Sequence, residues 1–415
     1  MATATFDYKV RDRDGKLVTG QLEGESQAIV SAKLRDMGYA PVQITQIRGV
    51  NVRKEINIPG LSDRVKLKEI ALMSRQLATM VAAGLTLVRS LGVLADQLES
   101  KALRDAMLQV RSDVEQGYLL SSALEKLPKI FSPLYISMVR AGEVGGSLDL
   151  VLLKLSTTLE KQVALRSKVR SAMSYPAIVV CLVIVIVAAL MIFVVPIFKG
   201  LFASLGGTLP LPTRIVIAVS NVVASVYLLV VIAAIIAIII AFRQWIASPG
   251  GRVTWDRFKL RPPIFGPLVH KVALTRFTST LSSLLSSGVP IIEALDIVAT
   301  NSGNVIVAEA VHGAQDGVRQ GQSLSSSLAQ YEVMPIMVTQ MIETGEESGA
   351  LDAMLEKVAE FYDNEVDSTI TSLTSILEPL LIITMGVCIG FIVVSMYLPM
   401  FDIYKLIQNS GGANS

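Results

Sequence analysis

Three long apolar runs dominate the pattern of hydrophobic and polar positions along this chain. Residues 171–198, 215–242 and 379–401 contain no Asp, Glu, Lys or Arg. Each run exceeds the ~20 residues with which an α-helix crosses the ~30 Å hydrocarbon core of a bilayer. The alternative is a helix buried in a soluble core, but such helices rarely stay uniformly apolar for more than about 14 residues. The pattern therefore predicts three transmembrane helices, at 175–198, 215–242 and 378–401.

Short amphipathic segments, punctuated by glycine and proline, occupy the stretches before the first and third runs and predict helical bundles. Their order occurs twice. Residues 141–149 are Ala-Gly-Glu-Val-Gly-Gly-Ser-Leu-Asp, and residues 344–352 are Thr-Gly-Glu-Glu-Ser-Gly-Ala-Leu-Asp. The same register pairs Val-Pro-Ile-Phe at 195–198 with Leu-Pro-Met-Phe at 398–401. The chain therefore contains two copies of one unit, each ending in an apolar run.

The predicted fold is an all-α membrane protein with a small α+β domain at its N-terminus. Residues 1–47 alternate like strands, with a turn at Asp14-Gly15 and a helix N-cap at Ser26, which predicts the order ββαβ. Each repeat is expected to form a bundle of about six helices. The remaining predicted segments are a linker at 48–65, the first cytoplasmic repeat at 66–174, an external loop at 199–214, a cytoplasmic linker at 243–267, the second cytoplasmic repeat at 268–377 and an external tail at 402–415.

Basic residues flank the apolar runs unevenly, which predicts the orientation of the chain. They precede the first run and follow the second, while the short loop between these runs carries only Lys199 and Arg214. By the positive-inside rule, this loop lies outside, the N-terminus is cytoplasmic and the C-terminus is external. The first residues show no signal-peptide pattern. The composition, 52% hydrophobic and 17% charged with a net charge of +2, fits a multi-pass membrane protein and indicates no special charged partner.

No constellation of residues predicts catalysis, a cofactor or a metal site. The phosphate-binding glycine motifs are absent, and His270 and His312 lack partners at metal-ligand spacing. Cys181 and Cys388 lie in different positions of the predicted spans. No basic run interleaved with aromatic residues indicates nucleic-acid binding. The spans also lack the ionisable residues that mark transport pathways. We therefore expect neither an enzyme nor a transporter.

The repeated segment supplies the candidate site residues. Gly142 and Gly345 fit helix ends, and Asp149 and Asp352 fit the first turn of the following helix, where a carboxylate interacts favourably with the helix dipole. These following helices are expected to continue into the first and third spans.

Glu143 and Glu346 fit their expected position less well, because a carboxylate beside a helix C-terminus is mildly unfavourable. One explanation is a hydrogen bond or salt bridge inside each bundle. The other is an acidic bundle edge that contacts a partner subunit, a basic protein or a cation, although one glutamate supplies too few oxygen ligands for a cation and Glu347 adds one only in the second copy.

Pro176 and Pro379 occupy equivalent positions where the bundle helices meet the apolar runs. A proline inside a helix removes one backbone hydrogen bond and clashes with the preceding turn. We expect these residues to kink or interrupt the helices and to act as hinges between bundle and membrane.

Several motifs resemble the inner-membrane platform proteins of type II secretion and type IV pilus systems, the GspF/PilC family. The similarity covers nearly the whole chain, in order. It rests on Arg-Gln-Leu-Ala-Thr-Met at 75–80 with Ala-Gly-Leu-Thr-Leu at 83–87, the repeated Gly-Glu-x-x-Gly-x-Leu-Asp segment, Tyr175-Pro176, Leu209-Pro210 with Thr213-Arg214, and Tyr-Leu-Pro-Met-Phe at 397–401. The second repeat departs from the first at 278–281, so the two bundles are expected to face different partners.

The resemblance implies a non-enzymatic platform in the bacterial inner membrane that couples a cytoplasmic ATPase to the polymerisation of pilins or pseudopilins. It implies further contacts with other inner-membrane assembly proteins and membrane lipid, and a homo-oligomeric state. Residues 75–80 and 396–401 favour the pilus branch. The alternatives are a membrane signalling scaffold without motor coupling, a small transporter and, last, a membrane enzyme.

Overall fold

The computed structural model of the chain describes residues 4–11, 17–24, 27–46, 65–205, 209–225, 227–263 and 265–411. The chain divides into two units, residues 1–64 and 65–415, and each is described by itself. The turn predicted at Asp14-Gly15, the N-cap predicted at Ser26 and nearly all of the predicted linker lie outside the described residues.

The N-terminal unit has the predicted order ββαβ. Strands β1 (Ala4–Arg11), β2 (Leu17–Gly24) and β3 (Ala40–Gln46) form an antiparallel sheet in the order β2-β1-β3, and helix α1 (Gln27–Asp36) precedes β3. Because strand side chains alternate between the two faces of a sheet, Phe6 and Val10 of β1 point to the same side. They pack with Val30 and Leu34 of α1 in a small core.

Each repeat folds into the predicted bundle. Within the described residues the first bundle consists of six helices, α2 (Leu67–Ala82), α3 (Leu87–Gln97), α4 (Lys101–Glu115), α5 (Leu120–Glu125), α6 (Pro133–Val144) and the start of α7 (Leu148–Ala189). The second repeats this order as α12 (Gly266–Leu285), α13 (Ile291–Asn301), α14 (Val305–Arg319), α15 (Leu324–Leu328), α16 (Ile336–Ser348) and the start of α17 (Leu351–Gly411). Gly84 and Gly288 end the first helix of each bundle at φ values of 84° and 83°, which glycine adopts without steric cost.

The two bundles share one continuous hydrophobic core. It includes fully buried residues of the first bundle, such as Met73 and Leu152, and of the second, such as Phe277 and Leu355. Polar contacts also join them. Ser137 donates to a carboxylate oxygen of Glu293 at 3.0 Å. We conclude that the bundles form one packed body.

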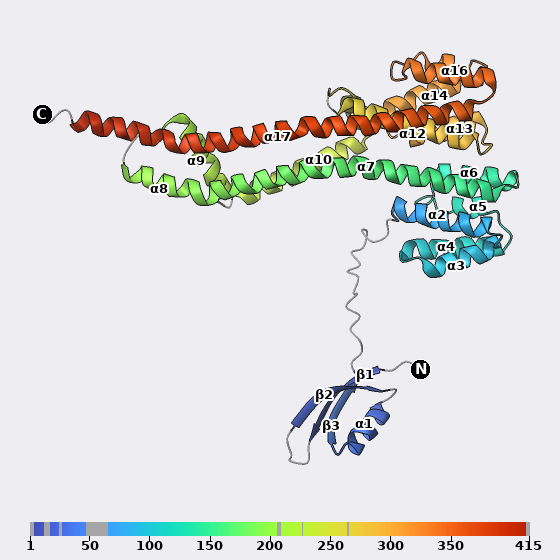
Figure 1. Cartoon of the computed structure of the whole chain (residues 1–415), viewed down its shortest axis with the longest axis horizontal. Coiled ribbons are helices and arrows are strands. Elements are labelled where there is room, and N and C mark those ends of the chain that lie inside the picture. Colours follow the sequence, from blue (N-terminus) through green and yellow to red (C-terminus); the bar gives the residue numbers. More distant parts are fainter. Residues whose placement is uncertain are drawn as a thin grey trace. The chain divides into compact units, whose positions relative to one another are not determined.

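The last helix of each bundle is also a membrane helix. Figure 1 shows α7 and α17 side by side, running in the same direction away from the bundles. Among the described residues, three stretches are long and apolar enough to cross a membrane, at Leu148–Leu201, Tyr227–Ala247 and Leu351–Phe401. The first continues from α7 through a π-helical turn, η1 (Leu190–Val194), into α8 (Val195–Leu205).

The structure differs from the prediction in the second apolar run. The segment predicted as one helix at 215–242 contains two, α9 (Leu211–Val223) and α10 (Tyr227–Ala247). Helix α9 begins at Leu211, between Pro210 and Pro212, whose fixed φ angles favour a helix start. It packs with η1, α8 and α17. None of the described residues of α10 is buried, so α10 offers most of its surface to its surroundings.

The predicted cytoplasmic linker at 243–267 also contains a helix, α11 (Pro249–Leu260). Its N-cap Ser248 accepts a hydrogen bond from the Gly251 amide at 3.2 Å and donates to the Trp245 carbonyl of α10 at 2.6 Å. A Cβ atom at Gly251 would lie 1.9 Å from that carbonyl oxygen. The turn between α10 and α11 is therefore so tight that only glycine fits at this position.

Candidate functional site

The repeated glutamate of the first bundle caps a neighbouring helix. Glu143 lies in the last turn of α6, and its carboxylate accepts hydrogen bonds from the backbone amides of Leu120 at 2.5 Å and Ser121 at 3.0 Å. These amides belong to the first turn of α5, where backbone donors have no partner within the helix. A carboxylate there also interacts favourably with the positive end of the helix dipole.

The second bundle repeats this cap. The Glu346 carboxylate accepts from the amides of Leu324 at 2.6 Å and Ser325 at 3.0 Å, at the start of α15. It also accepts from the Ser325 hydroxyl at 2.6 Å. The equivalent hydroxyl in the first bundle, on Ser121, is buried without a hydrogen-bond partner among the described residues. The second cap therefore has one more hydrogen bond than the first.

These contacts correspond to the within-bundle explanation of the two glutamates. Both carboxylates are partly buried and directed at their own bundle. Asp149 and Asp352 lie in the first turns of α7 and α17, as expected from the sequence. Asp149 is exposed, and the Asp352 carbonyl accepts from the Ser282 hydroxyl at 2.8 Å.

The expectation that Gly142 and Gly345 end helices is wrong. Both lie inside helices, α6 and α16, and the left-handed turns fall at Gly146 with φ 65° and Gly349 with φ 68°. Gly142 is needed for close packing instead, because a Cβ atom there would lie 2.9 Å from the Cβ of Val151 on α7. Its carbonyl accepts from the Ser147 amide at 2.9 Å, which closes the turn between the helices.

Pro176 and Pro379 lie inside α7 and α17, and neither helix is interrupted at its proline. Pro176 is buried and Pro379 is exposed. The structure therefore places both residues at the predicted junctions within continuous helices.

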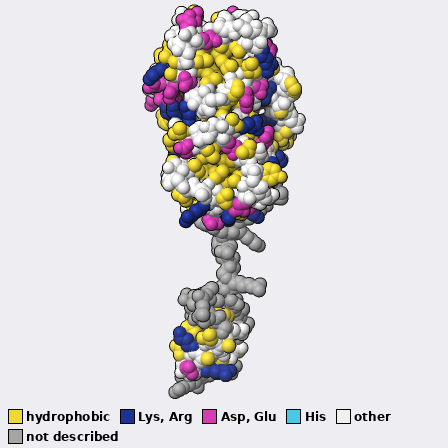
Figure 2. Space-filling view, turned by 90° about the vertical axis from the view of Figure 1, so that its right-hand side faces the viewer, with side chains coloured by type: hydrophobic (Ala, Val, Ile, Leu, Met, Phe, Trp, Pro, Cys, Tyr) yellow, Lys and Arg dark blue, Asp and Glu magenta, His cyan; other side chains and the backbone are white. Residues whose placement is uncertain are grey.

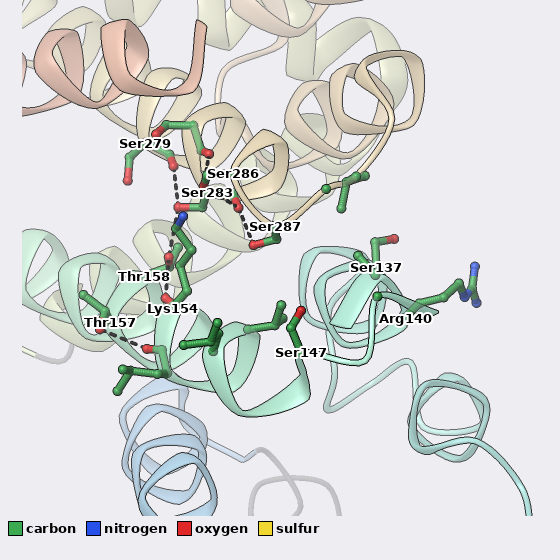
Figure 3. Close-up of a pocket in the computed structure, with 18 of the residues that line it drawn as sticks. Ser137, Arg140, Ser147, Lys154, Thr157, Thr158, Ser279, Ser283, Ser286 and Ser287 are labelled. Carbon is green, nitrogen blue, oxygen red and sulfur yellow. Dashed lines mark hydrogen bonds between the residues drawn. The ribbon is translucent and has the colours of Figure 1, made fainter. Parts of the chain in front are cut away.

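A polar cleft of about 1020 Å³ lies between the bundles. Figure 3 shows Ser279 and Ser283 of α12, with Ser286 and Ser287 of the turn that follows it, opposite residues of α7 such as Thr158. The hydroxyls of Thr158 and Ser283 are hydrogen-bonded at 3.0 Å across the cleft. This hydrogen bond fixes the distance between α7 and α12 at this point.

Charged pairs tie the long helices to their surroundings. Arg75 of α2 binds the Glu160 carboxylate of α7 through two nitrogens at 2.7 and 2.6 Å, and this contact raises the pKa of the Arg75 guanidinium. Lys168 of α7 bridges to α17 through Asp363 at 3.2 Å and Asp367 at 2.9 Å. The bridge lies just before the apolar part of both helices.

Arg276 of α12 is partly buried near the same helices. Burial, and secondarily the positive charge of Arg166, lowers the pKa of its guanidinium.

The basic and acidic side chains on the exposed end of the bundles are interspersed, as Figure 2 shows. Within the described ranges there is no group of three or more His, Cys, Asp and Glu residues that could hold a metal ion.

Sequence reasoning missed a polar clamp at the far end of the long helices. Pro196 and Pro399 have no amide hydrogen, so each leaves a carbonyl of the preceding turn without its helical partner. In the π-helical turn each amide bonds to the carbonyl five residues earlier, as Val195 does to Leu190. The residue five positions after Met191 is Pro196, which has no amide hydrogen, so the Met191 carbonyl has no helical donor. Hydroxyls of α9 serve both freed groups. Ser220 donates to the Met191 carbonyl at 2.5 Å, and Thr213 to the Ser395 carbonyl at 2.5 Å.

The clamp therefore joins α9 to the carbonyls freed by two equivalent prolines of the repeats, in surroundings formed by buried apolar side chains. Serine and threonine side chains are known to satisfy backbone groups freed by proline in membrane helices. The signal that could have predicted this clamp is the pair of hydroxyl residues on an apolar helix rich in valine and isoleucine.

Comparison with known proteins agrees with this architecture. The family model described as type II secretion system protein F matches residues 73–196 and again 277–399, the two repeats. The model of that protein's N-terminal domain matches residues 1–45. The duplicated match corresponds to the two bundles and their long helices.

Curated relatives match over nearly their full length. A type IV pilus assembly protein PilC from Thermus thermophilus is 46% identical over 399 residues, which is 96% of this chain and 98% of the relative. One from Myxococcus xanthus is 40% identical over 98% of this chain and 97% of the relative. A type II secretion system protein F from Vibrio cholerae is 32% identical over 98% of this chain and all of the relative. The chain therefore belongs to the type II secretion system protein F family, which includes the PilC proteins of type IV pilus assembly.

Proposed function

We propose that this protein is the inner-membrane platform of a type IV pilus or type II secretion machine and couples a cytoplasmic assembly ATPase to the polymerisation of pilins or pseudopilins. The main support is that the last helix of each bundle is itself a membrane helix. A displacement of a bundle would pass into the bilayer along a continuous helix, without an intervening loop. The protein acts by moving surfaces rather than by catalysing a reaction.

In this proposal the N-terminus and both bundles are cytoplasmic, and the C-terminus is external. The basic residues next to the membrane helices support this orientation. Pro176 and Pro379 are the proposed bending points of α7 and α17, because each removes one backbone hydrogen bond where bundle and membrane segments meet. The glutamate caps and the Lys168 bridge then keep each bundle rigid enough to transmit force.

The tip of the first bundle is the proposed contact surface for a partner. Val144 is 84% exposed and Leu150 is 65% exposed. Exposed apolar side chains of this size indicate a protein interaction site when they lie together. The repeat register places Glu347 and Ala353 at the equivalent positions of the second bundle. The bundles therefore present different surfaces, which fits distinct partners.

The membrane helices are the proposed site for pilins, other inner-membrane assembly proteins, lipid and a second copy of the chain. Helix α10 supports this assignment, since none of its described residues is buried. The relatives named for pilus assembly, at 46% and 40% identity, favour the pilus branch over the secretion relative at 32%.

Deletion of the gene tests the proposal. Surface pili or secreted cargo should be lost, while the cellular amounts of pilin and ATPase stay normal, and a plasmid copy should restore output. Unchanged output would refute the platform function. Loss of pilin synthesis, rather than of assembly, would favour the signalling-scaffold alternative.

A further inference from the structure

An aromatic cluster connects the end of α10 to α11. The ring centroids of Phe242 and Trp255 are 5.1 Å apart, Trp255 and Phe258 are 5.6 Å apart, and Phe242 and Trp245 are 5.9 Å apart. Phe242, Trp245 and Phe258 are 40%, 45% and 54% exposed. Aromatic rings with this combination of contact and exposure are concentrated where membrane helices leave the hydrocarbon.

Four arginines lie on the same segment as this cluster and have no acidic partner among the described residues. The side chains of Arg243, Arg252, Arg257 and Arg261 are exposed, and across the described part of the chain none forms an ion pair. The nearby Lys259 differs, since it pairs with Asp256 at 2.5 Å. An arginine fork fits phosphate oxygens well.

Buried Asp256 fastens α11 to the second bundle. Asp256 is 4% exposed, and its carboxylate accepts from the Val305 amide at the start of α14 at 2.9 Å. The Asn304 side-chain amide donates to the Asp256 carbonyl at 3.4 Å. At the N-terminal end of α11, the tight turn at Gly251 holds this helix to α10. Helix α11 therefore connects a membrane helix rigidly to a bundle.

We propose that α11 lies on the membrane surface and binds the phosphate groups of anionic phospholipids, with the aromatic cluster inserted at the depth of the glycerol backbone. The continuity of α11 with the apolar surface of α10 argues for lipid over an acidic protein. The aromatic rings and the unpaired arginines lie on one short segment, which also argues for lipid. Bound in this way, α11 fixes the height of the second bundle above the bilayer.

This site requires only that α10 is in a membrane, so it can fail while the platform function holds, and the reverse. Helix α11 lies outside both matched repeats, at 73–196 and 277–399.

The two tryptophans of the chain, Trp245 and Trp255, both belong to the cluster. Tryptophan fluorescence of the full-length protein in liposomes therefore reports on this site alone. In a Trp245→Phe chain, Trp255 should be quenched more strongly by phosphatidylcholine brominated near the glycerol backbone than by lipid brominated near the chain end. Absence of quenching by either lipid would place Trp255 outside the bilayer and overturn the proposal.

A second measurement tests the arginines. The full-length protein, purified from mixed phosphatidylcholine and phosphatidylglycerol, should retain phosphatidylglycerol preferentially. At low salt this preference should fall about fivefold for each residue changed in an Arg252→Gln, Arg257→Gln, Arg261→Gln series. The matched control replaces exposed basic residues of the bundles with glutamine: Arg89, Lys101 and Arg319. Equal retention of phosphatidylglycerol by the α11 variants and the control variants would contradict the proposal. Displacement of α11 from lipid by an acidic protein would also contradict it.

Discussion

Replacing Glu143 with alanine should lower the free energy of unfolding of the first bundle by about 2–4 kcal/mol, because two part-buried amides at the start of α5 lose their charged acceptor. The Glu346→Ala variant should lose at least as much, since the Ser325 hydroxyl also loses its partner. Glutamine should have an intermediate effect, because it keeps an acceptor and loses the charge. We expect thermal unfolding of the detergent-solubilised protein to shift downward by about 5–10 °C for each alanine variant.

Asp149→Ala is the matched control. Asp149 lies close to Glu143 in the sequence, in the first turn of α7, but it is exposed. Its interaction with the helix dipole contributes only about 0.3–1 kcal/mol. Equal shifts for Glu143→Ala and Asp149→Ala would contradict the capping role. Assembly by the glutamate variants should recover at low growth temperature. A stable variant that still fails to assemble would instead support the partner-contact explanation.

The double variant Thr213→Val, Ser220→Ala should release α9 from the long helices. Each substitution removes the hydroxyl that serves a carbonyl freed by a proline, in buried surroundings where water does not replace it. We expect a loss of about 1–2 kcal/mol for each hydroxyl. Thermal unfolding in nanodiscs measures this loss. Valine keeps the shape of threonine, so packing changes little.

Thr384→Val is the control for this variant. The Thr384 hydroxyl donates to the Leu380 carbonyl of its own helix at 2.7 Å, and no helix is held to another by that bond. Its replacement should leave the unfolding temperature nearly unchanged. If Thr384→Val and Thr213→Val behave alike, the clamp does not hold α9.

The repeats allowed most of the architecture to be predicted from the sequence. The shared register of 141–149 and 344–352 predicted two bundles of similar size, and the uncharged runs predicted membrane helices continuous with them. Asp149 and Asp352 marked the starts of α7 and α17 correctly. These features depend on local periodicity and composition, which a single sequence contains.

The role of the repeated glutamate could not be predicted in the same way. The amides capped by Glu143 lie more than twenty positions earlier, so the contact depends on how α5 packs beside α6. Gly142 was misplaced for a related reason. A glycine needed for close helix packing and a glycine that ends a helix look the same in sequence, and only the approach of Val151 distinguishes them.

The break between α9 and α10 left no signal either. Residues 224–226 contain neither glycine nor proline inside an uninterrupted apolar run. Helix α11, in contrast, could have been found. Ser248-Pro249 is a favourable N-cap followed by proline at the first helical position, which indicates a helix start inside the segment expected to be a linker.

In the proposed function, α7 and α17 transmit movement because they are continuous between bundle and membrane. Glycine weakens a helix by about 1 kcal/mol relative to alanine at each position. Exposed positions at the junction therefore permit a matched pair of variants, one with glycine and one with alanine at Ser171, Met173, Ser174, Thr371, Ser372 and Ser375.

The decisive measurement is the number of pili, or the amount of secreted cargo, that each variant restores in a strain lacking the gene, at equal membrane levels of the protein. We expect the alanine variant to restore normal output and the glycine variant, although inserted and folded, to restore little. Equal output from both variants would contradict it.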